Sequence, residues 1–83
     1  MPAERDCHVV SLVVHVLAER SDAAATVIGG LDGVEVHATD GAGRFVVLLE
    51  AEDESRILEA FRELEKVSGV LSVALVYHEV DAA

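Results

Sequence analysis

The order in which β-rich and helical segments alternate is the feature that most constrains this chain. Runs dense in β-branched residues occupy positions 9–17, 34–39, 44–49 and 70–77, a composition typical of strands. Two intervening stretches instead repeat apolar residues every three or four positions, which is typical of helices. These apolar stripes are Ala24, Val27, Ile28 and Leu31, followed by Ile57, Ala60, Phe61, Leu64 and Val67.

This order, strand–helix–strand–strand–helix–strand, predicts an α+β protein with the ferredoxin-like βαββαβ fold. We expect a four-stranded antiparallel sheet with the strand order 4-1-3-2 and two helices on one face. The 83 residues predict a single domain over 1–83, with an ordered core at about 7–79. Because both helices bury their stripes on the same side, the opposite face of the sheet is expected to stay uncovered.

Short polar signals mark the predicted helix ends and turns. Ser21 is the predicted N-cap of the first helix, and Asp53 or Ser55 that of the second. The run Asp40-Gly41-Ala42-Gly43 predicts a hairpin turn in which the glycines supply positive φ angles. The last strand is expected to end at Tyr77, with fraying at residues 81–83.

Successive side chains of a strand point to opposite faces, and this alternation assigns a side to each residue. Ala38 and Tyr77 are predicted to point toward the helices, whereas His78 is predicted on the uncovered face. The predicted centre of the uncovered face consists of Val9, Ser11, Val13, Val46, Leu48, Ser72, Ala74 and Val76.

The uncovered face is therefore expected to be apolar in the middle and polar at its ends. Glu35 and Glu50 lie toward one end, and His15 and Arg44 toward the other. An exposed apolar strip of this kind marks an interaction site or a homodimer contact. A ligand with a basic head and an apolar continuation matches the face, and a second copy of the chain is the alternative occupant.

Composition excludes several classes of partner. The net charge of −10 opposes contact with phosphate backbones, and only two Phe and one Tyr are available for stacking on bases, so we expect no nucleic acid partner. No apolar run reaches the ~18 residues that a membrane span needs, so we expect no direct membrane insertion. Residues 1–6 mix both charge signs, unlike a signal peptide, which predicts a cytoplasmic protein.

The residues that could carry chemistry do not form a recognisable active site. Cys7 is the only cysteine, which excludes an internal disulfide and a Cys-x-x-Cys copper loop. His15 and His78 are predicted at opposite ends of the uncovered face, with His8 on the other face, so we expect no metal site. The acidic run at 50–54 leads into a helix, where carboxylates favour the helix dipole. We therefore expect neither an enzyme nor a cofactor.

Three segments resemble the NapD family. They are Ser-Leu-Val-Val at 11–14, Glu-Ala-Glu-Asp at 50–53 and Gly-Val-Leu-Ser-Val-Ala-Leu-Val-Tyr-His at 69–78. The resemblance runs from about Cys7 to Glu79 with the same order of elements, and the Leu-Val-Tyr-His ending is its most specific part. The family comprises small cytoplasmic maturation chaperones of the periplasmic nitrate reductase.

The resemblance implies a chaperone that binds the twin-arginine signal peptide of the nitrate reductase catalytic subunit. It also implies that the complex delays export until molybdenum cofactor insertion and folding are complete. The family has no catalytic residues to transfer to this chain. We expect the protein to act as a monomer or a weak homodimer.

The uncovered face and the implied ligand agree in kind. We expect the apolar part of the peptide to lie on the centre of the face, and Glu35 and Glu50 to bind its two arginines. Arginine suits this role because its planar guanidinium pairs bidentately with a carboxylate. The predicted peptide-binding residues are Ser11, Val13, Glu35, Val46, Leu48, Glu50, Ser72, Ala74, Val76 and His78.

Two other functions are compatible with the residues. One is a small-molecule-binding regulatory domain, in which paired ferredoxin-like units hold a ligand between subunits. The other is a structural subunit that pairs through an open edge of the sheet.

Overall fold

Four strands form one antiparallel sheet in the order β2-β3-β1-β4, which confirms the predicted topology. The computed structural model describes residues 6–82; the charged segment at 1–5, on which part of the cytoplasmic prediction rests, lies outside the described residues. The elements are β1 (Asp6–Val16), the 3-10 helix η1 (Ala18–Arg20), α1 (Ser21–Gly29), β2 (Val34–Thr39), β3 (Arg44–Ala51), α2 (Glu54–Glu65) and β4 (Val70–Ala82). The fold is ferredoxin-like, as the order of elements predicts.

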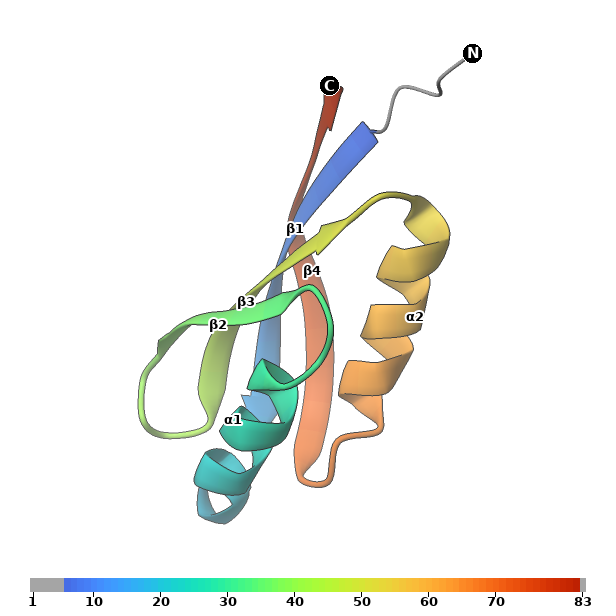
Figure 1. The fold of residues 1–83 in the computed structure, drawn as a ribbon. Coiled ribbons are helices and arrows are strands. Elements are labelled where there is room, and N and C mark those ends of the chain that lie inside the picture. The colour runs from blue at the N-terminus through green and yellow to red at the C-terminus, as the bar shows by residue number, and fades with distance from the viewer. Residues whose placement is uncertain (1–5, 83) are drawn as a thin grey trace.

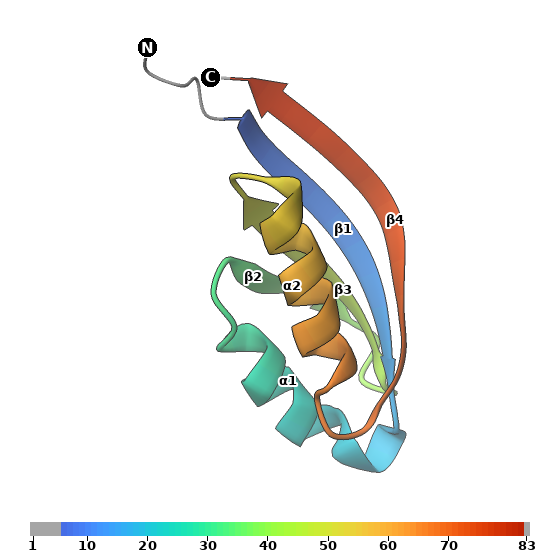
Figure 2. The same ribbon diagram turned by 90° about the vertical axis from the view of Figure 1, so that its right-hand side faces the viewer.

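Both helices pack on the same face of the sheet, and the other face is left bare (Figures 1 and 2). Alternate residues of β1 are fully buried against the helices, because this strand lies in the middle of the sheet. The core consists of Val10, Leu12, Val14, Val16, Ala24, Ile28, Val34, Phe45, Val47, Leu49, Ala51, Ile57, Ala60 and Leu64. We call the opposite, bare side of the sheet the open face.

The two helices begin in different ways. Asp53 is the N-cap of α2, and its side chain accepts a hydrogen bond from the backbone N–H of Arg56 at 2.9 Å, as predicted. The prediction that Ser21 caps the first helix is wrong, because Ser21 is the first residue of α1. The N-cap of α1 is Arg20, and its side chain makes no capping hydrogen bond. The reason is η1, whose 3-10 turn leads directly into α1.

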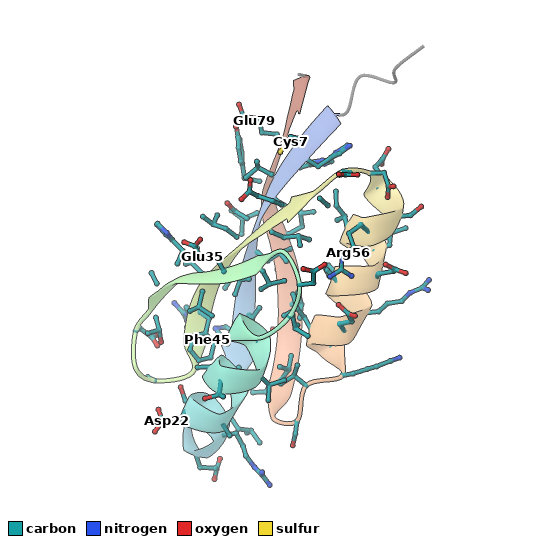
Figure 3. All side chains as sticks on the ribbon, viewed as in Figure 1. Cys7, Asp22, Glu35, Phe45, Arg56 and Glu79 are labelled. Carbon is teal, nitrogen blue, oxygen red and sulfur yellow. The ribbon has the colours of Figure 1, made fainter. Side chains whose placement is uncertain are left out.

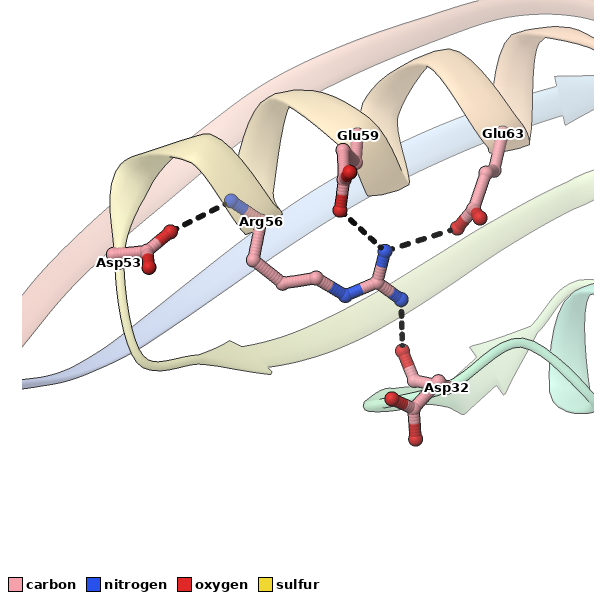
Figure 4. Close-up of polar contacts among 5 residues, drawn as sticks. All are labelled: Asp32, Asp53, Arg56, Glu59 and Glu63. Atoms are coloured by element: carbon pink, nitrogen blue, oxygen red, sulfur yellow. Dashed lines mark hydrogen bonds and ion pairs between the residues drawn. The ribbon is translucent and has the colours of Figure 1, made fainter.

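Arg56 fastens α2 to the loop before β2 (Figure 4). Its guanidinium donates to the backbone oxygen of Asp32 at 2.7 Å and lies 3.3 Å from the carboxylate of Glu63. The Arg56 side chain is 24% exposed, so this contact to a backbone oxygen is partly shielded from water. Arg56 thereby ties α2 to the loop that joins α1 to β2.

Gly33 brings the start of β2 close to β3. Its φ of 76° lies in the left-handed region, and its carbonyl accepts a hydrogen bond from the N–H of Glu50 at 3.0 Å. A Cβ at this position would lie 2.8 Å from the backbone oxygen of Glu50, so only glycine permits the approach. The contact fixes the start of β2 beside the end of β3. Glu35 and Glu50 therefore lie in neighbouring cross-strand rows of the sheet.

The strand register has three irregularities. One, between His15 and Val16, leaves Leu71 as an extra residue in β4. The other two change the faces predicted for several residues. Between β1 and β4, Ser11 pairs with Tyr77 and Leu12 with Leu75, which leaves Val76 as an extra residue in β4. Between β2 and β3, the shift between Val36 and Ala38 leaves His37 as an extra residue. Each bulge reverses the alternation for the residues beyond it.

The strand β4 is also longer than predicted. It continues past Tyr77 to Ala82, and its end pairs with the start of β1, where Asp6 lies opposite Ala82. The described part of the predicted frayed segment is therefore strand, and Ala83 lies outside the described residues.

Candidate functional site

The register aligns the side chains of the open face in cross-strand rows. Val9, Ser11, Val13 and His15 of β1 are the centres of these rows, because they alternate with core residues of the same strand. The rows are Glu50, Val9 and Glu79; Glu35, Leu48, Ser11 and Tyr77; Ala38, Val46, Val13 and Ala74; and Arg44, His15 and Ser72.

Carboxylates gather at the end of the open face nearest the chain termini. Glu50 and Glu79 flank Val9 in the first row, and Glu35 lies in the next row. Figure 3 shows Glu79 beside Cys7 at this end, with Glu35 on β2. All three glutamates are exposed. We call this the acidic end, and it is defined by Glu35, Glu50 and Glu79.

The opposite end of the open face, which we call the hairpin end, consists of Arg44, His15 and Ser72. The Nε of Arg44 donates a hydrogen bond to the Nε2 of His15 at 2.9 Å, so His15 acts here as a neutral acceptor. Asp40 lies next to this end, in the hairpin loop. Backbone N–H groups of Ala42 and then Arg44 donate to its carboxylate and hold the pKa of Asp40 below the ordinary value of 3.8.

Between the two ends the open face is apolar. Val13 and Val46 pair in the third row and are half-buried, as is Leu48 in the second row. Ala74 completes the third row from β4 and is exposed. No described residue covers these side chains, which leaves an apolar band between two polar ends.

Most of the predicted binding residues come together on this face. The register places Ser11, Val13, Glu35, Val46, Leu48, Glu50, Ser72 and Ala74 in its rows. Their contact with a ligand stays a prediction, but their common surface is a property of the sheet.

His78 does not lie on the open face, and its predicted place there is wrong. The bulge at Val76 turns it toward the helices, where it pairs with Val10 and lines a groove with Ile57 and Leu58 of α2. Its Nε2 lies 2.9 Å from the Nδ1 of His8. His8 itself is buried, with only 8% of its surface exposed. The same bulge removes Val76 from the row pattern and leaves it 62% exposed.

Tyr77 and Glu79 take the places that alternation assigned to other residues. Tyr77, predicted to face the helices, instead pairs with Ser11 on the open face and is 54% exposed. Glu79 was missed because the last strand was predicted to end at Tyr77, whereas β4 continues to Ala82. In β2, Ala38 likewise moves to the open face, where it pairs with Val46. No glycine or proline marks either bulge in the sequence.

The described residues offer no arrangement that would hold a metal ion. Within 6–82, no three histidine, cysteine, aspartate or glutamate side chains gather in a suitable cluster. His8 and His78 meet as a pair only, and His15 is on the other face of the sheet. None of the described helices has the length and apolar character needed to cross a membrane.

The open face thus carries an apolar band between the acidic end and the hairpin end. The sequence profile described as NapD protein matches residues 7–82. The chain belongs to the NapD family. This membership confirms the resemblance seen in the three sequence segments.

Relatives within the NapD family cover most of this chain. Chaperone NapD of Haemophilus influenzae is 35% identical over 78 residues, which are 93% of this chain and 84% of that protein. Chaperone NapD of Escherichia coli strain K12 is 38% identical over 72 residues, which are 86% and 83% of the two chains. A chaperone has a non-enzymatic role, which confirms the expectation that NapD proteins such as this one are not enzymes.

A solved structure supports the same membership. The solution structure of the E. coli Tat proofreading chaperone protein NapD matches with a TM-score of 0.84 at 35% sequence identity. The match covers 93% of this chain and 82% of that one. The ferredoxin-like fold with one bare sheet face is therefore the NapD fold in this chain.

Proposed function

We propose that this protein is a cytoplasmic chaperone that binds the twin-arginine signal peptide of the periplasmic nitrate reductase catalytic subunit on its open face. Binding keeps the signal peptide from the export machinery until molybdenum cofactor insertion and folding are complete. Membership of the NapD family and the likeness to a Tat proofreading chaperone of E. coli support this proposal.

The observation that carries the proposal is the polarity of the open face. Glu35, Glu50 and Glu79 form its acidic end, and the apolar band around Val13 and Val46 follows within the next two rows. A twin-arginine signal has the complementary order, with two adjacent arginines followed by an apolar segment. The basic and apolar parts of the peptide thus follow one another in the same order as the acidic end and the apolar band of the open face.

The dimensions of the face fit a short helical segment. The rows from Val9 to His15 span seven residues of β1, and the six steps between them cover roughly 20 Å at ~3.3 Å per residue. A helix of about 13 residues covers the same distance at 1.5 Å per residue. This length holds the basic motif together with the start of the apolar segment.

Apolar contact should supply most of the affinity, and the acids should select the ligand. Ion pairs of exposed carboxylates such as Glu35 and Glu50 contribute about 1 kcal/mol or less each. Burial of apolar surface contributes about 25 cal/mol per Å², and the apolar band provides the contact. The carboxylates add selectivity because a guanidinium binds a carboxylate through two parallel hydrogen bonds.

Isothermal titration calorimetry with the synthetic signal peptide tests the proposal. Three peptides separate its parts: the natural sequence, one with both arginines replaced by lysine, and one with the apolar segment replaced by serine and glycine. We expect saturable binding of the first, weaker binding of the second and loss of binding of the third. Failure of the natural peptide to bind would overturn the proposed function, and equal binding of all three would overturn the assigned selectivity.

A further inference from the structure

The two ends of the open face carry different net charge. The acidic end has three carboxylates, Glu35, Glu50 and Glu79. The hairpin end has the guanidinium of Arg44 and the neighbouring carboxylate of Asp40, and His15 is a neutral acceptor, so this end is neutral overall. The difference is aligned with β1, along the direction in which a bound segment would lie.

Arg44 is the residue that keeps the hairpin end from being acidic. Its backbone N–H donates to Asp40 Oδ1 at 3.1 Å, and its side chain turns to His15 on the open face. A hollow of about 250 Å³ beside it is lined by Ala38, Thr39, Asp40, Arg44 and Val46. This hollow continues the apolar band at the end away from the glutamates, because Ala38 and Val46 belong to the third row.

We propose that the signal peptide binds in one direction only, with its amino-terminal arginines over the acidic end and its carboxyl-terminal part over the hairpin end, and that Arg44 enforces this direction. The inference rests on the proposed function and adds the polarity of binding to it. In the reverse direction the peptide's arginines would lose the attraction of the three carboxylates at the acidic end. They would instead lie at the neutral hairpin end, beside the positively charged guanidinium of Arg44.

The dipole of a helical peptide acts in the same sense. The amino terminus of a helix carries a partial positive charge and the carboxyl terminus a partial negative charge. The proposed direction places the positive end of the peptide at Glu50 and Glu79, and its negative end at Arg44. Side-chain charge and backbone dipole of the peptide thus favour one orientation.

Paramagnetic relaxation enhancement measures this direction in the intact complex. A nitroxide is attached at the amino terminus of the peptide through a linkage that does not exchange with Cys7, the free thiol of the protein. Wild-type protein should lose amide signals of Val9, Glu50 and Glu79 and keep those of His15, Arg44 and Ser72. These two sets lie at opposite ends of the open face, roughly 20 Å apart.

The variant Arg44→Glu should remove the direction, because it makes both ends of the open face acidic. Both sets of amide signals should then lose intensity. Arg62→Glu is the matched control with the same change of charge on the exposed side of α2, and it should keep the wild-type pattern. The wild-type measurement tests the direction independently of any variant.

The outcomes separate this inference from the proposed function. Loss of signals at the hairpin end, or equal loss at both ends, in the wild-type complex would overturn the inference and leave binding to the open face intact. An unchanged pattern in Arg44→Glu would overturn the role of Arg44. Absence of binding, or binding without signal loss anywhere on the open face, would overturn the proposed function and the inference together.

Discussion

His8 and His78 join the two ends of the chain on the helix side of the sheet. The Nδ1 of His8 lies 2.9 Å from the Nε2 of His78, although 70 positions separate them in the sequence. One ring nitrogen donates and the other accepts, so at least one of the two rings is neutral. His8 is buried, and this bond gives its Nδ1 a partner at the position where β1 also pairs with the last residue of β3, Ala51.

Replacing one partner of this pair should destabilise the protein. His78→Leu leaves the buried Nδ1 of His8 without a partner, which costs about 1–3 kcal/mol of unfolding free energy. The double variant His8→Leu with His78→Leu should recover most of this loss, because no polar group then remains buried. Urea unfolding measures all four members of the cycle, and strictly additive effects would contradict the pairing.

Leu48 should be essential for peptide binding. Leu48→Asp places a charge in the apolar band and should abolish measurable binding while the circular dichroism spectrum stays unchanged. Leu58→Asp is the matched control, since Leu58 is 60% exposed on the helix side of the molecule and should be neutral for binding. Equal loss in the two variants would place the site elsewhere.

The glutamates of the acidic end should govern the salt dependence of binding. Glu35→Gln with Glu50→Gln should weaken binding by about 1–2 kcal/mol in total and flatten the fall of affinity with ionic strength. The control pair Glu19→Gln with Glu65→Gln removes two exposed carboxylates outside the open face. An identical salt response in the two double variants would contradict the assignment of the arginines.

Tyr77 should distinguish arginine from lysine in the peptide. Its ring is exposed on the open face next to Glu79, where a guanidinium can stack on it while it pairs with the carboxylate. Tyr77→Leu should reduce the preference for arginine over lysine several-fold, and Tyr77→Phe should keep it. Calorimetry with the two peptides measures the preference, and an unaltered preference in Tyr77→Leu would remove Tyr77 from the recognition site.

The contribution of Asp40 to the stability of the folded protein should depend on pH. Backbone N–H groups of Ala42 and Arg44 lower the pKa of Asp40 from 3.8, so the charged form favours the folded state. Its contribution is present above the ordinary value of 3.8 and is lost as the pH falls through the depressed pKa. Asp40→Ala should unfold at a lower temperature than wild type at pH 7, with the gap closing at strongly acidic pH. A gap of equal size at both pH values would contradict this linkage.

Local signals in the sequence predicted the fold, because they act over a few residues. The cap at Asp53 was predictable from its side-chain chemistry, and the positive φ angles of Gly41 and Gly43 from the hairpin turn. The strand order followed from the βαββαβ order of elements, and the bare face from the need of both helices to bury their stripes on one side.

The binding face was less predictable, because its composition depends on register. The bulges at His37 and Val76 have no local signature, since both occur in runs that favour strands. A single extra residue in a strand moves every later side chain to the opposite face of the sheet. The extra residue Val76 therefore puts Tyr77 and Glu79 on the open face, where His78 was predicted. Residues of β1 were placed correctly because alternation in the central strand is enforced by burial on one side.

The most direct test of the central claim is an amide chemical-shift titration of the labelled protein with the twin-arginine signal peptide. We expect saturable shifts in the rows of the open face, strongest at Val13, Val46 and Tyr77, and little change in the exposed residues of α2. Shifts concentrated in the groove of Leu58 and His78, with the open face unaffected, would contradict it.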